Sequence, residues 1–152
     1  MRIRRIFLGV LAGLFLLTVA FQAFAQEDVV KKRRALMKSN NKAFKAIKKA
    51  GKKNDFATIE SEAKVIAANL DKIPDLFPKG STSEKSRAKP AIWEKWDTFN
   101  QKRIAVKTAA NELAEAAKAE DGQKVSSIVK GFGKKCGSCH RSFRKPRKKK
   151  KS

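Results

Sequence analysis

The stretch Cys136-Gly137-Ser138-Cys139-His140 decides how the rest of the chain is interpreted. It is a Cys-x-x-Cys-His run, the pattern by which haem is attached covalently to a polypeptide. On a helix, positions i and i+3 share a face, so both thiols can reach the two vinyl groups of one porphyrin. His140 follows Cys139 directly, and its imidazole can bind the iron as the proximal ligand. The motif therefore predicts one haem c, held by thioether bonds from Cys136 and Cys139.

Three other uses of these residues compete with haem attachment. A structural zinc site normally needs four nitrogen or sulfur ligands, whereas Cys136, Cys139 and His140 are the only cysteines and the only histidine in the chain. A redox-active thiol pair is expected near a strand–helix–strand pattern, which the sequence lacks. A plain disulfide is open to the two cysteines in an oxidising compartment. Haem attachment is favoured over all three.

Residues 1–25 have the three parts of an export signal. Three arginines lie within the first five residues, an apolar run follows at 6–21, and Ala23-Phe24-Ala25 is typical of a cleavage site. The apolar run is shorter than the roughly 20 residues that span a bilayer. Cleavage before Gln26 is therefore favoured over an uncleaved anchor, and the export signal together with the haem motif predicts a bacterial periplasmic protein.

The balance of charge is strongly basic. The chain has a formal net charge of +23, and removal of the three arginines of the signal leaves +20. Export removes the protein from cytoplasmic nucleic acid, so acidic redox proteins or an anionic membrane surface are the expected partners. Residues 26–144 are long enough for one domain. Lys145–Ser152 is a block of like charge, which predicts a disordered basic tail that assists electrostatic docking.

Apolar residues recur at helical spacing through most of residues 26–144. The pattern predicts four helices, with an irregular connection at Pro74–Lys89. We expect Asn54 or Asp55 to cap the second helix and Asp121 to cap the fourth. Together these features predict an all-α protein, an antiparallel four-helix bundle with covalently attached haem between its fourth and first helices. The expected helices cover about 28–50, 54–73, 90–117 and 122–143.

Four stretches carry a resemblance to a known family. They are Arg33-x-x-x-Met37-Lys38, Leu76-Phe77-Pro78-x-Gly80, Ala88-Lys89-Pro90-x-Ile92-Trp93 and Gly133-Lys134-x-Cys136-Gly137-x-Cys139-His140-x-x-Phe143-Arg144. Over residues 26–144 the sequence resembles the class II c-type cytochromes, that is, the cytochrome c prime family and its low-spin relatives. The resemblance implies an antiparallel four-helix bundle, often a homodimer, with His140 as proximal ligand and Cys136 and Cys139 as the thioether residues.

The resemblance also implies roles on the distal side of the haem. Met37 matches the residue that faces the sixth iron position, where a thioether either binds the iron or only fills the pocket. Arg33 matches a residue near a haem propionate, where the contact is charge-assisted, although a solvated charge is the alternative. Arg144 matches a residue beside the proximal imidazole, or it merely begins the basic tail.

Three functions are consistent with these features. The favoured one is a periplasmic cytochrome that transfers electrons between redox partners, with Met37 as sixth ligand. The alternative is a five-coordinate cytochrome c prime that binds nitric oxide or carbon monoxide. A basic helical bundle without haem that binds polyanions is the third. No acid–base or nucleophilic constellation is visible, which argues against an enzyme.

Overall fold

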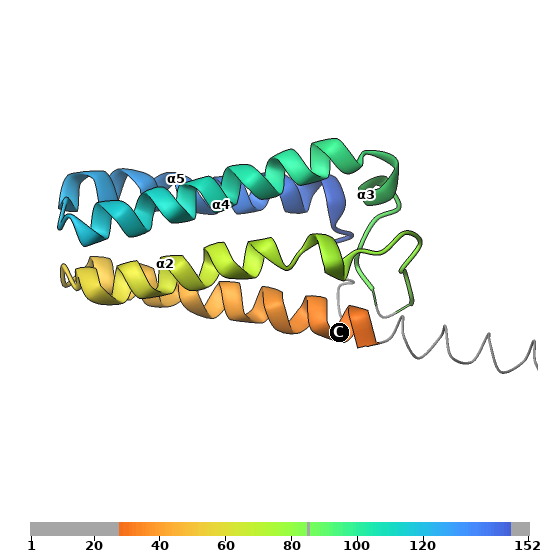
Figure 1. Ribbon diagram of the computed structural model, residues 1–152, viewed down its shortest axis with the longest axis horizontal. Helices are drawn as coiled ribbons and strands as arrows, with labels where there is room; N and C mark the ends of the chain where they lie inside the picture. Colours follow the sequence, from red (N-terminus) through yellow and green to blue (C-terminus); the bar gives the residue numbers. More distant parts are fainter. Residues whose placement is uncertain (1–27, 85, 147–152) are drawn as a thin grey trace, which may run out of the picture.

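The structure is a computed structural model that describes residues 28–84 and 86–146. Four long helices make up most of it and pack as one bundle (Figure 1). The predicted all-α fold is confirmed, because outside the helices the described residues contain only turns, irregular segments and an isolated bridge between Ala88 and Arg144. In chain order the elements are the N-terminal helix (residues 28–51), α2 (Phe56–Asp71), the 3-10 helix η1 (Pro74–Leu76), α3 (Ala91–Glu94), α4 (Trp96–Lys118) and α5 (Gly122–Phe143).

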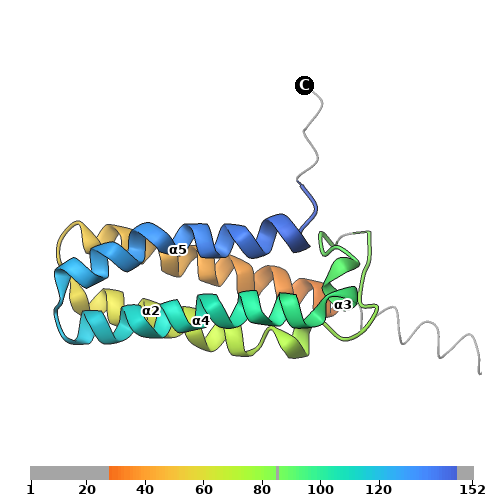
Figure 2. The ribbon, with the colours of Figure 1, turned by 90° about the horizontal axis from the view of Figure 1, so that it is seen from above.

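Successive long helices run in opposite directions, as predicted for an antiparallel bundle (Figure 2). Two tight turns close one end of the bundle, after the N-terminal helix and between α4 and α5 (Figure 1). The opposite end holds α3, the long connection between α2 and α4, the start of the N-terminal helix and the end of α5. The Cys-x-x-Cys-His segment therefore lies near the end that this connection crosses.

The two ends of the sequence lie largely outside the described residues. The predicted export signal, residues 1–25, is outside them, and so are residues 147–152 of the predicted tail. Within the described ranges, no helix is both long and apolar enough to cross a membrane. The signal and the tail stay predictions from the sequence.

Local sequence sets the starts of α2 and α5, and both expected caps are confirmed. The Asp55 carboxylate accepts a hydrogen bond from the backbone N–H of Thr58 at 3.0 Å. The Asp121 carboxylate accepts one from the backbone N–H of Lys124 at 2.9 Å. Each bond satisfies a donor that has no partner inside the helix. The register of α5, and with it the position of the haem motif, begins at this cap.

The third predicted helix is interrupted, which is a correction. The sequence pattern predicts one helix from Pro90 onward, whereas α3 ends at Glu94 and α4 begins at Trp96. Lys95 between them has φ −126° and ψ 49°, which is not helical. Nearby, the Trp93 indole N–H donates to the Phe77 and Pro78 carbonyls at 3.1 and 2.9 Å, which ties α3 to the connection from α2. Helical spacing continues through the break, so periodicity alone does not reveal it.

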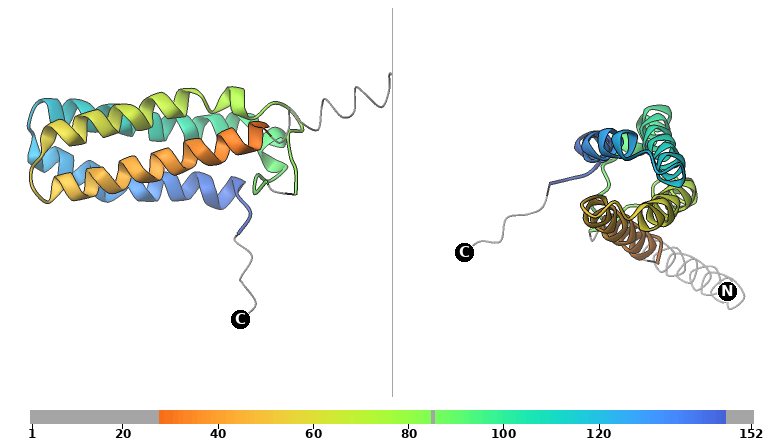
Figure 3. Two further views of the ribbon diagram at one scale, coloured as in Figure 1. Left: turned by 90° about the horizontal axis from the view of Figure 1, so that it is seen from below. Right: turned by 90° about the vertical axis from the view of Figure 1, so that its left-hand side faces the viewer.

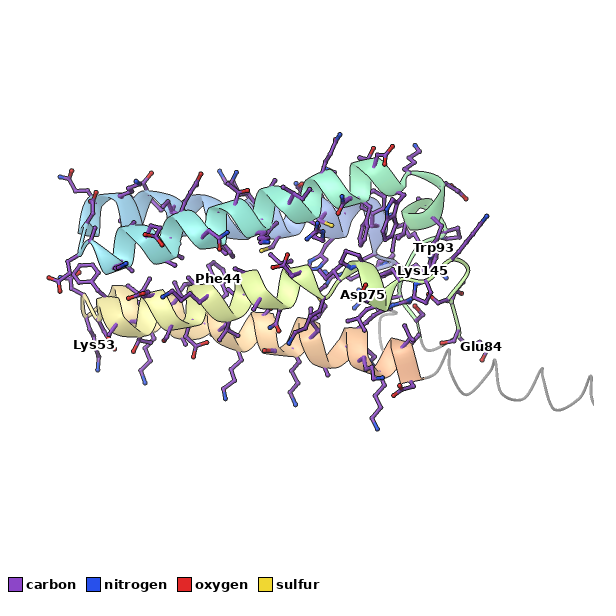
Figure 4. The ribbon with its side chains drawn as sticks, viewed as in Figure 1. Phe44, Lys53, Asp75, Glu84, Trp93 and Lys145 are labelled. Atoms are coloured by element: carbon purple, nitrogen blue, oxygen red, sulfur yellow. The ribbon has the colours of Figure 1, made fainter. Side chains whose placement is uncertain are left out.

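The core lies along the axis of the bundle, where all four long helices contribute. Phe44 of the N-terminal helix projects between the helices (Figure 4) and stacks on Phe132 of α5, with ring centroids 5.2 Å apart. Phe143, at the end of α5, meets Phe99 of α4 edge-on at 5.3 Å. These rings fix how α5 sits against its neighbours. The largest fully buried side chains are Phe132, Ile47, Ile59, Ile66, Ile92 and Leu113.

Candidate haem-binding site

The two cysteines lie on the side of α5 that packs against the core. Cys136 and Cys139 are free, half-buried, and in contact with the buried cluster. Phe132 precedes them by one turn and Phe143 follows, and both are buried. The thiols therefore share one apolar face of a single helix, which is the arrangement that the three-residue spacing predicts.

Burial controls the protonation of both thiols. It raises the pKa of the Cys136 thiol, and it also raises the pKa of the Cys139 thiol, although the Lys102 ammonium partly opposes the second shift. Lys102, on α4, also donates to the Ser138 hydroxyl at 3.1 Å. This bond ties the middle of the motif to α4, and it adds a residue that sequence reasoning missed. The thiols are thus neutral at pH 7, and the turn of α5 between them is hydrogen-bonded to α4.

The imidazole of His140 is held in its neutral form. Burial lowers its pKa, and the positive charges of Arg144 and Arg87 lower it further. A neutral imidazole has a free nitrogen lone pair, which is the form that binds a metal. Arg144 is thus one of the cations that act on His140, and its role beside a proximal iron ligand stays a prediction from the resemblance. Arg87 acts on the same ring but was not identified from the sequence.

A short strap, residues 87–89 of the connection between α2 and α4, is hydrogen-bonded to the end of α5. The backbone N–H of Lys89 donates to the Phe143 carbonyl at 3.0 Å, and that of Lys145 donates to the Arg87 carbonyl at 2.7 Å. The Arg87 guanidinium donates back to the Lys145 carbonyl at 3.0 and 2.7 Å. These residues are more than 50 positions apart in the sequence, so only the fold reveals the pairing. The strap fixes α5 immediately after His140.

Helix register brings Met37 level with the motif. The N-terminal helix and α5 lie side by side and antiparallel (Figure 3), joined by the contact between Phe44 and Phe132. Met37 precedes Phe44 by seven residues, and Cys139 follows Phe132 by seven. Because seven residues advance each helix by about 10.5 Å, Met37 stands opposite the level of Cys139 and His140. Its side chain is half-buried and packs on the core.

Arg33, one turn before Met37, is a buried cation that donates hydrogen bonds to the connection after α2. Its side chain is 6% exposed. The guanidinium donates to the Leu76 carbonyl, to the Ser81 carbonyl at 2.7 Å and to the Ser81 hydroxyl. Burial lowers its pKa to about 10, so it stays charged at pH 7. Three of its five N–H donors serve the connection, and the sequence did not predict this use.

Aromatic rings complete the environment of Arg33. The guanidinium carbon lies 4.0 Å from the ring centroid of Phe77 and 5.9 Å from that of Trp93. Phe77 in turn stacks against Phe99, with centroids 5.2 Å apart. Such cation–π contacts are worth most when the cation is desolvated. The guanidinium is therefore fixed on one side by carbonyls and on another by aromatic faces.

The donor set suits a porphyrin better than a bare metal ion. Among the described residues, no three His, Cys, Asp or Glu side chains converge in a way that could hold a metal ion. Two thiols and a neutral imidazole on one helix instead match the two vinyl groups and one iron ligand of a single haem. The fold and this donor set define a helical-bundle c-type cytochrome.

Comparison with known proteins identifies the family. The family model described as Cytochrome C' matches residues 28–144, so the chain belongs to the cytochrome c' family and carries one covalently attached haem c. It is 36% identical over 118 residues to a cytochrome c-556 of Agrobacterium fabrum, covering 76% of this chain and 80% of that protein. It is 33% identical over 141 residues to a cytochrome c' of Rhodopseudomonas palustris, covering 90% of this chain and 94% of that protein.

The fold has close counterparts among solved structures. One is a nitric oxide complex of a mutant cytochrome c prime from Alcaligenes xylosoxidans. It aligns with a TM-score of 0.72 at 26% identity, over 80% of this chain and 97% of that one. Proteins of this family bind haem and serve in electron transfer or in gas binding.

Proposed function

We propose that the protein is a periplasmic electron carrier whose single haem c is attached through Cys136 and Cys139, with His140 as proximal and Met37 as distal iron ligand. The level register of Met37 with His140 on two antiparallel helices is the observation that carries this proposal. Haem supplies the one-electron couple when bound, and a thioether ligand raises its potential. The chain supplies the two axial donors and an apolar shell.

Arg33 and Arg144 have supporting roles in this proposal. Arg33 has two N–H donors beyond the three that hold residues 76–81, and these are suited to a haem propionate. Burial, together with the charges of Arg144 and Arg87, lowers the pKa of the His140 imidazole and keeps it neutral, which favours its binding to iron. Arg33 would then join the propionate to the connection after α2.

The expected partners follow from the charge. The net charge of +23, or +20 once the three arginines of the export signal are removed, favours acidic redox proteins or an anionic membrane surface and gives an electron-transfer rate that falls with ionic strength. Export by residues 1–25 and assistance from the tail, Lys145–Ser152, belong to the same proposal. A homodimer rests on the family resemblance.

A second candidate function is gas binding by five-coordinate iron. The observation in its favour is the similarity to the cytochrome c prime solved as a nitric oxide complex. The two functions differ by a single bond, from iron to the Met37 sulfur. A methionine that packs without binding leaves one face of the iron open to nitric oxide or carbon monoxide.

Two substitutions of Met37 separate the candidates. Met37→Leu keeps the volume of the side chain but removes the sulfur, and Met37→Ala also opens space. We expect low-spin wild-type protein that takes up carbon monoxide slowly, and high-spin, reactive protein from both variants, measured by optical spectra of the oxidised and reduced forms. A wild type that is already high-spin, with a spectrum that Met37→Leu does not change, would reject ligation and establish gas binding as the better proposal.

A further inference from the structure

Six cations line the outer face of the N-terminal helix. Their spacing of three, four, four, three and four residues keeps them on one side of a helix, and each is exposed. From first to last they extend over about 27 Å of helix axis. Figure 4 shows long side chains pointing away from the bundle along this helix. We call the set the basic stripe: Lys31, Arg34, Lys38, Lys42, Lys45 and Lys49.

The charge of the basic stripe is not balanced locally. The sequence has no Asp or Glu from Val29 to Asn54. Asp28, at the start of the helix, is paired with Lys32 at 2.6 Å, and Lys32 is not part of the stripe. Within residues 28–84 and 86–146, none of the six stripe residues takes part in an ion pair. The stripe is therefore a row of uncompensated positive charge.

The basic stripe also lacks apolar contact area. The opposite face of the helix supplies the core through Leu36, Ala43 and Ile47. Among the described residues, the exposed large hydrophobic side chains are Val65 and Ile104, which belong to α2 and α4. Protein interfaces usually combine a desolvated apolar anchor with a polar rim. A straight cationic row without an anchor instead fits a flat array of separate negative charges.

We propose that the basic stripe binds the protein to anionic phospholipid headgroups, with the N-terminal helix lying along the membrane surface. Each Lys or Arg near such a surface strengthens binding by about fivefold, and no apolar residue needs to enter the lipid. A second copy of the chain is a poor occupant, because a two-fold interface would place six cations against six. The proposal goes beyond electron transfer, and it holds whether or not Met37 binds iron.

The test compares two charge-matched variants in the haem-loaded protein that begins at Gln26. One changes all six stripe residues to Gln. The other changes six exposed lysines elsewhere to Gln: Lys72, Lys79, Lys95, Lys118, Lys124 and Lys130. Both keep the basic tail and lose the same charge. We expect the stripe variant to lose at least about 100-fold in partitioning onto mixed phosphatidylcholine–phosphatidylglycerol vesicles, and the control variant less than about tenfold. A three-residue variant, Lys38→Gln with Lys42→Gln and Lys45→Gln, and a helical circular dichroism spectrum guard against loss of folding.

Acetylation footprinting gives the second readout. The vesicles should protect Lys38, Lys42 and Lys45 from acetylation and leave Lys118 and Lys124 reactive. Equal losses in the two variants, or equal binding to pure phosphatidylcholine, would overturn the proposal. So would a wild type that ignores the anionic vesicles but binds a soluble acidic redox protein through the stripe. An optical spectrum that is the same in all variants separates this result from failure of the proposed haem ligation.

Discussion

The two sides of the proposed haem site are built in different ways. On the proximal side, Cys136, Cys139 and His140 lie within five consecutive residues of α5, and the geometry of one helix sets their relative positions. On the distal side, Met37 and Arg33 belong to another helix, and Arg33 is held by residues 76–81, more than 40 positions away. The proximal side is therefore local chemistry, whereas the distal side depends on the packing of the whole bundle.

The two sides are nevertheless joined by a chain of aromatic contacts. Arg33 lies 4.0 Å from the centroid of Phe77, Phe77 lies 5.2 Å from Phe99, and Phe99 lies 5.3 Å from Phe143. Phe143 is one turn after His140 on α5. A change at Arg33 should therefore loosen the distal side first and reach α5 only through these rings. This difference orders the effects that we expect from mutation.

The largest effect belongs to the proximal side. Changing Cys136→Ala together with Cys139→Ala removes both thioether bonds, so we expect complete loss of covalent haem. Haem should then extract into acidified acetone, whereas in the wild type it stays with the protein. The haem-free chain should also unfold more easily, because bound haem stabilises the folded state.

A matched control for this prediction lies between the two cysteines. Ser138→Ala removes the hydroxyl that accepts a hydrogen bond from Lys102 but leaves both thiols. It should retain covalent haem in full. Haem that extracts from the wild type, or attachment that survives in the double alanine variant, would contradict the assignment of the thioether residues.

The same contrast explains what the sequence could predict. The spacing of Cys136, Cys139 and His140 was enough to predict that they lie together on one helix. The preference of aspartate for helix N-caps was enough to predict the roles of Asp55 and Asp121. The family resemblance singled out Met37 and Arg33, but periodicity alone did not. Hydrogen bonds between distant segments were not predicted: they join Arg33 to Ser81, Lys102 to Ser138, and Arg87 to Lys145. The break in the helix at Lys95 was not predicted either, and it lies beside the tertiary hydrogen bonds of Trp93. No local pattern encodes such contacts.

An intermediate effect is expected from the distal side at Arg33. Arg33→Ala leaves the Leu76 and Ser81 carbonyls without their donor and opens space beside Phe77, so we expect a loss of about 2–4 kcal/mol in the free energy of unfolding. Arg33→Lys keeps the charge but not the forked geometry and should recover only part of that loss. Denaturant unfolding of the haem-loaded protein measures both values.

The exposed neighbour Arg34 provides the control at this site. Arg34→Ala should change stability by less than about 0.5 kcal/mol. Covalent haem should stay in place in all three variants, because the proximal thiols are untouched. If Arg33→Ala were as harmless as Arg34→Ala, the distal side would not depend on the Arg33 contacts, and the contrast between the two sides would fail.

The smallest effect is a gain in stability on the proximal helix. Gly131 lies inside α5, and an added Cβ would meet no atom within 4 Å. Gly131→Ala should therefore raise the free energy of unfolding by about 0.5–1 kcal/mol, because glycine in a helix costs about that much relative to alanine.

Gly80, in the connection beyond α2, has φ +72°, which alanine adopts only with strain. Gly80→Ala should thus destabilise the protein, although nothing lies within 4 Å of its added Cβ either. Denaturant midpoints and optical spectra, taken together, test the pair. If Gly131→Ala is more stable and its spectrum is unchanged, the proximal ligand does not depend on the flexibility of glycine in α5. A loss of stability in Gly131→Ala would instead mean that α5 needs the conformational freedom of glycine at this position.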